Sequence, residues 1–131
     1  NVLEDVFKRQ RARSLFVEFP RPSLLALYQL ISNLPQDAVP SDRMDRKHVE
    51  KKIMAACAQS GLMQDEDWAS NPNTIRVELS ILEWVTIVSL LRMLSNSAQT
   101  MPDSERSFLQ EELMEDSRAR IEGAVKQEGA G

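Results

Sequence analysis

The sequence predicts a mainly α-helical domain of four to five helices with a minor two-stranded antiparallel ribbon. Two short stretches alternate apolar and polar side chains, as half-buried strands do, and each precedes longer segments with apolar residues at helical spacing. A capping motif, S-I-L-E, marks the second strand-to-helix junction. At 131 residues and 42% apolar content, the chain is expected to form one domain, 1–131, with its own core.

The first elements are expected to be an arm, a strand and a helix. Residues 2–13 form a short helix or arm that ends in basic side chains. Residues 15–19 alternate as a strand, which the prolines at 20 and 22 end. From Ser23 a wide apolar stripe predicts a helix that runs to about Asn33.

A second helix and a surface connection should follow. Three residues can cap the start of this helix: Ser41, Asp42 and Asp45. Gly61 supplies its stop. The Asn, Pro and acidic residues of 62–73 indicate a surface connection, which Trp68 should anchor to the core.

The second half begins with a strand over 75–79 and a strongly apolar helix. Ser80 and Glu83 should form a capping box, in which each side chain accepts a hydrogen bond from a backbone N–H of the new helix. The helix carries too many apolar residues for one exposed face, so we expect it to be the most buried element. It should end around residues 95–100.

The last helix is expected to begin near Thr100, with Pro102 in its first turn. Four apolar residues mark its inner side: Leu109, Leu113, Ile121 and Val125. Two opposite-charge pairs should support its outer side: Asp116 with Arg120, and Glu122 with Lys126.

The two halves of the chain show an internal repeat. A shift of 60 residues superposes 15–34 on 75–94, and ten of these twenty pairs are apolar in both copies, against roughly three or four expected by chance. The same shift carries three apolar residues of the second helix, Val49, Ile53 and Met54, onto Leu109, Leu113 and Met114. The alternative is a coincidental agreement between amphipathic helices.

If the repeat is real, the chain consists of two strand-helix-helix units, 14–61 and 74–127. Each unit has one strand, and a lone strand leaves its backbone donors and acceptors unsatisfied. The two strands should therefore pair antiparallel, with four helices on one side and a pseudo-twofold axis relating the halves.

The segments RVELS and FVEFP, each followed by an apolar helix, give this plan a resemblance to the ribbon-helix-helix family of DNA-binding proteins. In that family the outward strand side chains read bases in the major groove. The resemblance implies this role for Arg76, Glu78, Ser80, Phe16 and Glu18. Glu18 and Glu78 depart from it, because they would face phosphates with like charge, and the connections at 34–44 and 95–100 are not the family's tight turns.

Charge is distributed unequally along the chain. Residues 1–60 hold ten Lys or Arg against seven Asp or Glu, and the remainder holds six against thirteen. Candidate protein-interaction residues are Arg46, Lys47, Lys51 and Lys52 on the second helix, and Glu111, Glu112, Glu115 and Asp116 on the last. Candidate nucleic-acid contacts are Lys8, Arg9, Arg11, Arg13 and Arg76.

Three interpretations of these charges remain open. In the first, both charged regions are solvated helix faces without a specific role. In the second, they are patches for head-to-tail contact or for a partner of mixed charge. In the third, the basic half contacts nucleic acid.

The sequence predicts no catalytic residues, no metal site and no cofactor. His48 and Asp45 can share a helix face, but two ligands do not make a zinc site. Cys57 fits a buried small hydrophobe better than a nucleophile. The acidic run 65–67 lacks the spacing of a calcium loop, and no phosphate-binding glycine motif occurs.

We therefore expect a non-enzymatic protein-protein interaction domain that acts as an adaptor, regulator or assembly component. Its partner would be another protein or a second copy of itself. The alternative is a ribbon-helix-helix-like DNA-binding regulator, although a net charge of −4 confines any nucleic-acid contact to a local patch.

The cellular setting is inferred from what the sequence lacks. It has no apolar run of membrane-spanning length, and its single cysteine fits the cytoplasm or another reducing compartment. Because the chain starts at Asn1 and shows no signal-peptide pattern, we expect a trimmed chain or a piece of a longer protein.

Overall fold

The computed structural model describes residues 13–35, 37–38, 44–105 and 107–130. The expected arm up to residue 12, with Lys8, Arg9 and Arg11, and the candidate caps Ser41 and Asp42 lie outside these ranges. Six main elements follow in order: β1 (Ser14–Phe19), α2 (Arg21–Ser32), α3 (Arg46–Gln59), β2 (Ile75–Ser80), α4 (Ile81–Gln99) and α5 (Phe108–Ala130). Two short 3-10 turns are η1 (Trp68–Ser70) and η2 (Asp103–Glu105).

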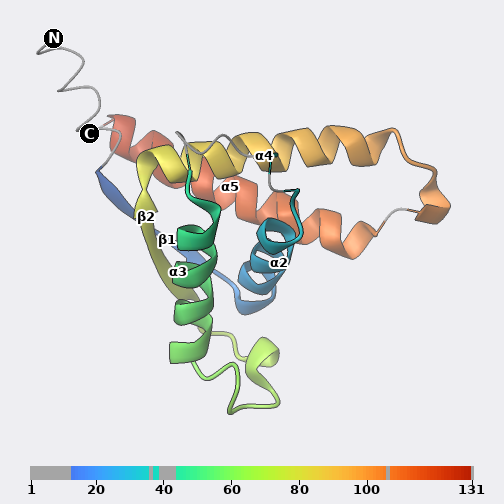
Figure 1. Cartoon of the computed structure of the whole chain (residues 1–131). Coiled ribbons are helices and arrows are strands. Elements are labelled where there is room, and N and C mark those ends of the chain that lie inside the picture. The colour runs from blue at the N-terminus through green and yellow to red at the C-terminus, as the bar shows by residue number, and fades with distance from the viewer. Residues whose placement is uncertain (1–12, 36, 39–43, 106, 131) are drawn as a thin grey trace, which may run out of the picture.

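The two strands form an antiparallel ribbon, which confirms the predicted pairing (Figure 1). Ser14 faces Ser80, Val17 faces Val77 and Phe19 faces Ile75. Alternate side chains of both strands are buried, so one face of the ribbon packs on the helices and the other faces solvent. The part of the chain that the structure describes has the expected fold, with four helices and a small sheet.

The register of the ribbon agrees with a pseudo-twofold axis through Val17 and Val77. The 60-residue offset carries Val17 onto Val77, its own partner in the ribbon. It also carries Leu15 and Phe19 onto Ile75 and Leu79, and these four residues face each other in crossed pairs. The packing of the second helix of each half also agrees with this axis: α3 of the first half packs on β2, and α5 of the second half packs on β1.

Local signals set the start of α3 and α4. The Asp45 carboxylate accepts hydrogen bonds from the backbone N–H of Lys47 and His48, at 3.1 and 3.4 Å. The expected capping box is present: Ser80 Oγ accepts from the Glu83 N–H at 3.2 Å, and Glu83 Oε1 accepts from the Ser80 N–H at 2.9 Å. Both helices therefore begin where side-chain chemistry predicts.

Trp84 joins α4 to the ribbon at the centre of the core. Its side chain is fully buried, and its indole N–H donates to the Leu15 carbonyl at 2.9 Å. The ring lies 5.8 Å from that of Phe19, centre to centre. Trp84 thereby packs the start of α4 against β1.

Arg21 forms hydrogen bonds to the segment that connects α3 to β2. The side chain is buried, and its guanidinium donates to the carbonyls of Asn73, Ser60 and Trp68 at 3.3 to 3.4 Å. It also lies 5.3 Å from the centre of the Trp68 ring. Trp68 is buried as expected, and its indole N–H donates to Ser60 Oγ at 2.9 Å. Carbonyl dipoles and an aromatic face thus solvate this buried cation.

Two helix starts differ from expectation. α2 begins at Arg21, before Ser23, because Pro22 sits in its first turn, where the missing N–H is not needed. α5 begins at Phe108, well after Thr100 and Pro102. There Ser107 Oγ accepts from the Gln110 N–H at 3.4 Å, so a local cap at Ser107 sets the start of the helix.

The burial of α4 and α5 also differs from expectation. α4 is not the most buried element, because its distal part extends with α5 beyond α2, and Val85 and Met93 are exposed (Figure 1). Leu109 was assigned to the inner side of α5 but is exposed in the same projecting hairpin, whereas Ile121 is fully buried. Glu122 pairs with Arg92 and Arg118 rather than with Lys126.

Removing the capping box tests the local control of α4. We expect Ser80→Ala to lower the free energy of unfolding by about 1 kcal/mol, because the Glu83 N–H loses its acceptor. Urea unfolding followed by circular dichroism measures this difference. The matched control is Ser97→Ala, on the exposed end of the same helix, which should change the free energy by less than about 0.5 kcal/mol. Equal effects of the two substitutions would contradict the role of the cap.

Candidate protein-interaction surfaces

The solvent face of the ribbon presents an aromatic ring beneath an arginine. Phe16 is 50% exposed, and the Arg76 guanidinium lies 4.4 Å from the centre of its ring. Arg76 also pairs with Glu18 at 3.9 Å. Phe16, Glu18 and Arg76 are exposed, and Glu78 and Ser80 are partly buried, so the set expected to point outward does so.

These surface contacts are weak enough to open for a partner. An exposed ion pair contributes about 0.2–1 kcal/mol, and an exposed cation–π contact about 0.5–1 kcal/mol. The face carries two carboxylates, Glu18 and Glu78, against the one guanidinium of Arg76. Its local charge is therefore acidic, which disfavours close approach of a phosphate backbone.

A cationic side chain contacts one outer carbonyl at each edge of the ribbon. Lys52 Nζ of α3 donates to the Glu78 carbonyl, and Arg120 of α5 donates to the Glu18 carbonyl, both at 3.4 Å. The two carbonyls are equivalent under the 60-residue offset. Because charged side chains at an edge disfavour pairing with a further strand, recognition by the ribbon would use its face.

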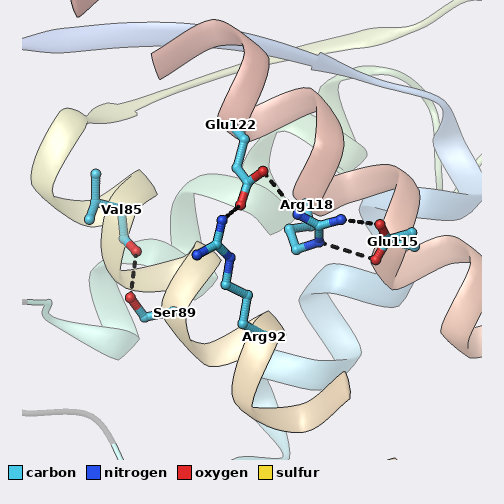
Figure 2. Close-up of polar contacts among 6 residues, drawn as sticks. All are labelled: Val85, Ser89, Arg92, Glu115, Arg118 and Glu122. Carbon is cyan, nitrogen blue, oxygen red and sulfur yellow. Dashed lines mark hydrogen bonds and ion pairs between the residues drawn. The ribbon is translucent and has the colours of Figure 1, made fainter. Parts of the chain in front are cut away.

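A chain of alternating charges crosses from α4 to α5 (Figure 2). Arg92 of α4 pairs with Glu122 of α5, and Arg118 donates to Glu122 at 2.9 Å. Arg118 also donates to Glu115 through Nε, at 3.1 Å. The network links the two helices through side chains next to the buried residues Leu91 and Ile121.

The network shifts the pKa values of its members. The hydrogen bond from Arg118 lowers the pKa of Glu115 below its ordinary value. Burial works to raise the pKa of Glu122, but hydrogen bonds from Arg92 and Arg118 outweigh it, and the net pKa is lowered. The same bonds, that to Glu115 first, raise the pKa of Arg118. Both carboxylates therefore stay ionised at neutral pH.

Two open hollows flank this network on the α4–α5 surface. One, of about 220 Å³, has an apolar floor of Val85, Val88 and Val125. The other, of about 260 Å³, lies toward the tip of the hairpin, and we call it the tip groove. Its lining is Ser95, Gln99, Phe108, Glu111, Glu112 and Glu115. The tip groove thus combines an aromatic ring with three carboxylates.

Of the eight predicted interaction residues, some make contacts within the fold and the others lie on exposed surfaces. Arg46 donates to the Leu34 carbonyl and pairs with Glu50, and Asp116 accepts from Ser23 Oγ at 2.8 Å while pairing with Arg120. These two support the fold, and Glu115 belongs to the α4–α5 network. Lys47, Lys51 and Lys52 are exposed on α3, and Glu111 and Glu112 line the tip groove. The structure therefore separates a basic helix face from an acidic groove.

The nucleic-acid candidates fall on no single surface that the structure describes. Arg13 is exposed and pairs with Glu128 at 3.7 Å, at the end of the ribbon near the end of α5. Arg76 lies on the ribbon face, paired with Glu18.

Residues with possible reactive chemistry lie apart. Burial raises the pKa of the Cys57 thiol, although nearby Arg21 opposes the shift, so the thiol stays protonated at neutral pH. His48 is exposed, and the Asp45 carboxylate caps α3. Within the described ranges no three His, Cys, Asp or Glu side chains gather as metal ligands, and no helix has the length and apolarity to cross a membrane.

Sequence reasoning missed the residues whose partners are distant in the chain. Arg21 contacts residues 39 to 52 positions away, and Arg92 pairs with a residue 30 positions away. No local pattern signals these contacts. The outward position of Phe16 and Arg76, in contrast, follows directly from strand alternation.

Comparison with protein-family models, curated proteins and solved structures found no match to this chain.

The lowered pKa of Glu122 predicts a pH-dependent contribution to stability. A carboxylate with a depressed folded-state pKa stabilises the protein above its unfolded-state pKa, near 4.3 for glutamate, and this contribution disappears as pH falls through the folded-state value. Glu122→Gln should therefore destabilise the protein at pH 7, and the difference from the wild type should shrink toward about pH 3. Urea midpoints measured across this range test it.

Glu112→Gln serves as the control, since Glu112 is exposed and takes no part in the network. Its small effect on the urea midpoint should not change with pH. A Glu122→Gln difference that stays constant down to about pH 3 would contradict the proposed ionic contribution.

Proposed function

We propose that this chain is a non-enzymatic protein-recognition domain, acting as an adaptor, regulator or assembly component, with the outer face of the ribbon as its main contact surface. One observation carries the proposal: a half-exposed phenylalanine lies under an arginine on a sheet face that none of the described elements covers. Aromatic residues and arginine are enriched in protein interfaces, and tyrosine, tryptophan and arginine dominate their energetics.

The setting of this face supports protein recognition. The helices pack on the opposite side of the ribbon, so Phe16 is held on a rigid platform (Figure 1). The cationic side chain at each edge directs a partner toward the face. Glu18, Arg76 and Glu78 around the ring form a polar rim of mixed charge, which suits a protein surface that offers both an apolar pocket and charged groups.

DNA binding is the second candidate, and the paired ribbon is the observation that favours it. A two-stranded ribbon fits the major groove, and Arg76 is of the type that reads guanine. Two carboxylates on the same face oppose it, because each would approach the phosphates with like charge. We therefore rank it below protein recognition.

Crosslinking from the ribbon distinguishes the two candidates. A photoreactive phenylalanine analogue at position 16 should give adducts in the source cell that survive nuclease and are shifted by protease. The same analogue at Ala69, exposed on η1, is the matched control and should give no such adducts. Adducts that nuclease removes would favour DNA, and absence of adducts specific to position 16 would contradict recognition by this face.

A duplex-DNA titration tests the second candidate directly. We expect no binding at about 50 mM salt, because the ribbon face is acidic. Binding at low salt that falls steeply as salt rises, and that Arg76→Ala weakens, would instead support the ribbon-helix-helix-like function. Fluorescence anisotropy of a labelled duplex measures both outcomes.

A further inference from the structure

The tip groove and the outer face of α3 carry opposite charge on one molecule. Phe108, 54% exposed, lies in the groove with Glu111, Glu112 and Glu115, and the described residues that line the groove carry net negative charge. On α3, Lys47, Lys51 and Lys52 are exposed. Each surface therefore offers the charge that the other lacks.

The internal repeat of the sequence aligns these opposite charges with each other. The 60-residue offset carries Lys51 and Lys52 of α3 onto Glu111 and Glu112 of α5. The two helices occupy corresponding places, each packed on the strand of the other unit. In the structure α5 is shifted relative to this offset, because Lys52 and Arg120, rather than Lys52 and Glu112, contact the equivalent carbonyls of Glu78 and Glu18.

The shapes of the two surfaces also correspond. Ala55 and Ala58 are exposed on α3 beside the lysines, and such small side chains let a helix approach a neighbouring surface closely. The tip groove offers Phe108 as an apolar contact, with Ser95 and Gln99 on its α4 side. A helix that lies in an apolar groove rimmed by complementary charge is a recurring mode of protein recognition.

We propose that the tip groove binds the outer face of α3 of a second copy of this chain, with Ala55 and Ala58 near Phe108 and the lysines opposite the carboxylates. This inference rests on the proposed recognition function and names the chain itself as one partner. The contact joins two different surfaces, so each copy keeps a free groove or a free α3 face until a ring closes or a chain extends.

The contact should be weak and strongly dependent on salt. The groove is small, and interfaces at the low end of the size range are transient. Its charges are exposed, so ions at about 0.5 M, with a Debye length of about 4 Å, screen them. We therefore expect the weight-average mass to rise with protein concentration at about 20 mM salt and to return to the monomer value at about 0.5 M.

Sedimentation equilibrium with two charge variants tests the proposal. Lys47→Glu/Lys51→Glu makes the α3 face acidic and leaves Lys52 on the ribbon edge. Gln99→Lys/Glu112→Lys sets two lysines against Glu111 and Glu115, which removes the net negative charge of the groove lining and leaves the α4–α5 network intact. Each double variant alone should be monomeric, because its α3 face and its groove no longer carry opposite net charge. An equimolar mixture of the two variants should form a heterodimer, because the unaltered groove of the α3 variant can bind the unaltered α3 face of the groove variant.

The mixture is therefore predicted to give a mass up to that of a dimer, while the separate variants stay at the monomer mass. Gln64→Lys/Glu66→Lys is the matched control for the groove variant, with the same change in charge on the exposed loop after α3. It should associate like the wild type. If either reversal impairs folding, seen as lost helical circular dichroism, the neutral pair Lys47→Gln/Lys51→Gln replaces it and should reduce association.

A wild-type chain that is monomeric at low salt, or association that neither reversal abolishes, would overturn the proposal. The recognition function of the ribbon face can still be tested separately, because crosslinking from position 16 detects partners of that face. Loss of self-association with retained crosslinks to another protein would reject the second copy as partner. Loss of both would reject the proposed function as well.

Discussion

The pairing of β1 with β2 is the interaction on which the rest of the structure depends. Each half of the chain contributes one strand, and the backbone groups of a single strand have no partner within their own half. Pairing satisfies these groups only if residues about 60 positions apart meet, so the ribbon joins the halves into one core. Leu15, Val17 and Phe19 of one strand and Ile75, Val77 and Leu79 of the other then supply one wall of that core.

Several other contacts serve this pairing. Trp84 bonds the Leu15 carbonyl from the first turns of α4, and Arg21 holds the connection that leads into β2. Lys52 and Arg120 each contact one outer carbonyl, at the two edges. With one face on the helices and a cationic side chain at each edge, the remaining face is the part of the ribbon available to a partner. The proposed function follows from that geometry and from the Phe16 and Arg76 side chains that it displays.

Sequence patterns predicted the parts of the fold that depend on near neighbours. Strand alternation located both strands, and the capping box at Ser80 located the start of α4. Asp45, one of three candidate caps, starts α3. The unpaired-strand argument then predicted the ribbon. The start of α5 and the exposure of Leu109 were mispredicted, because apolar periodicity does not reveal how far a helical hairpin projects beyond the core.

The candidate surfaces were predictable to a similar extent. Helical spacing correctly placed Lys47, Lys51 and Glu112 on exposed surfaces. It could not show that Arg46 and Asp116 make contacts within the fold, since Leu34 and Ser23 are their partners only after folding. Nor could it show the tip groove, which needs α4 and α5 side by side.

The register of the ribbon is the most direct test of this account. A one-residue slip of β1 along β2 would turn Phe16 into the core and Val17 out to solvent, so the same measurement tests the fold and the proposed contact face. Cross-strand nuclear Overhauser effects in the labelled protein should place Val17 opposite Val77, with Leu15 opposite Leu79 and Phe19 opposite Ile75. Contacts in a shifted register, or no contacts between the two strands, would contradict it.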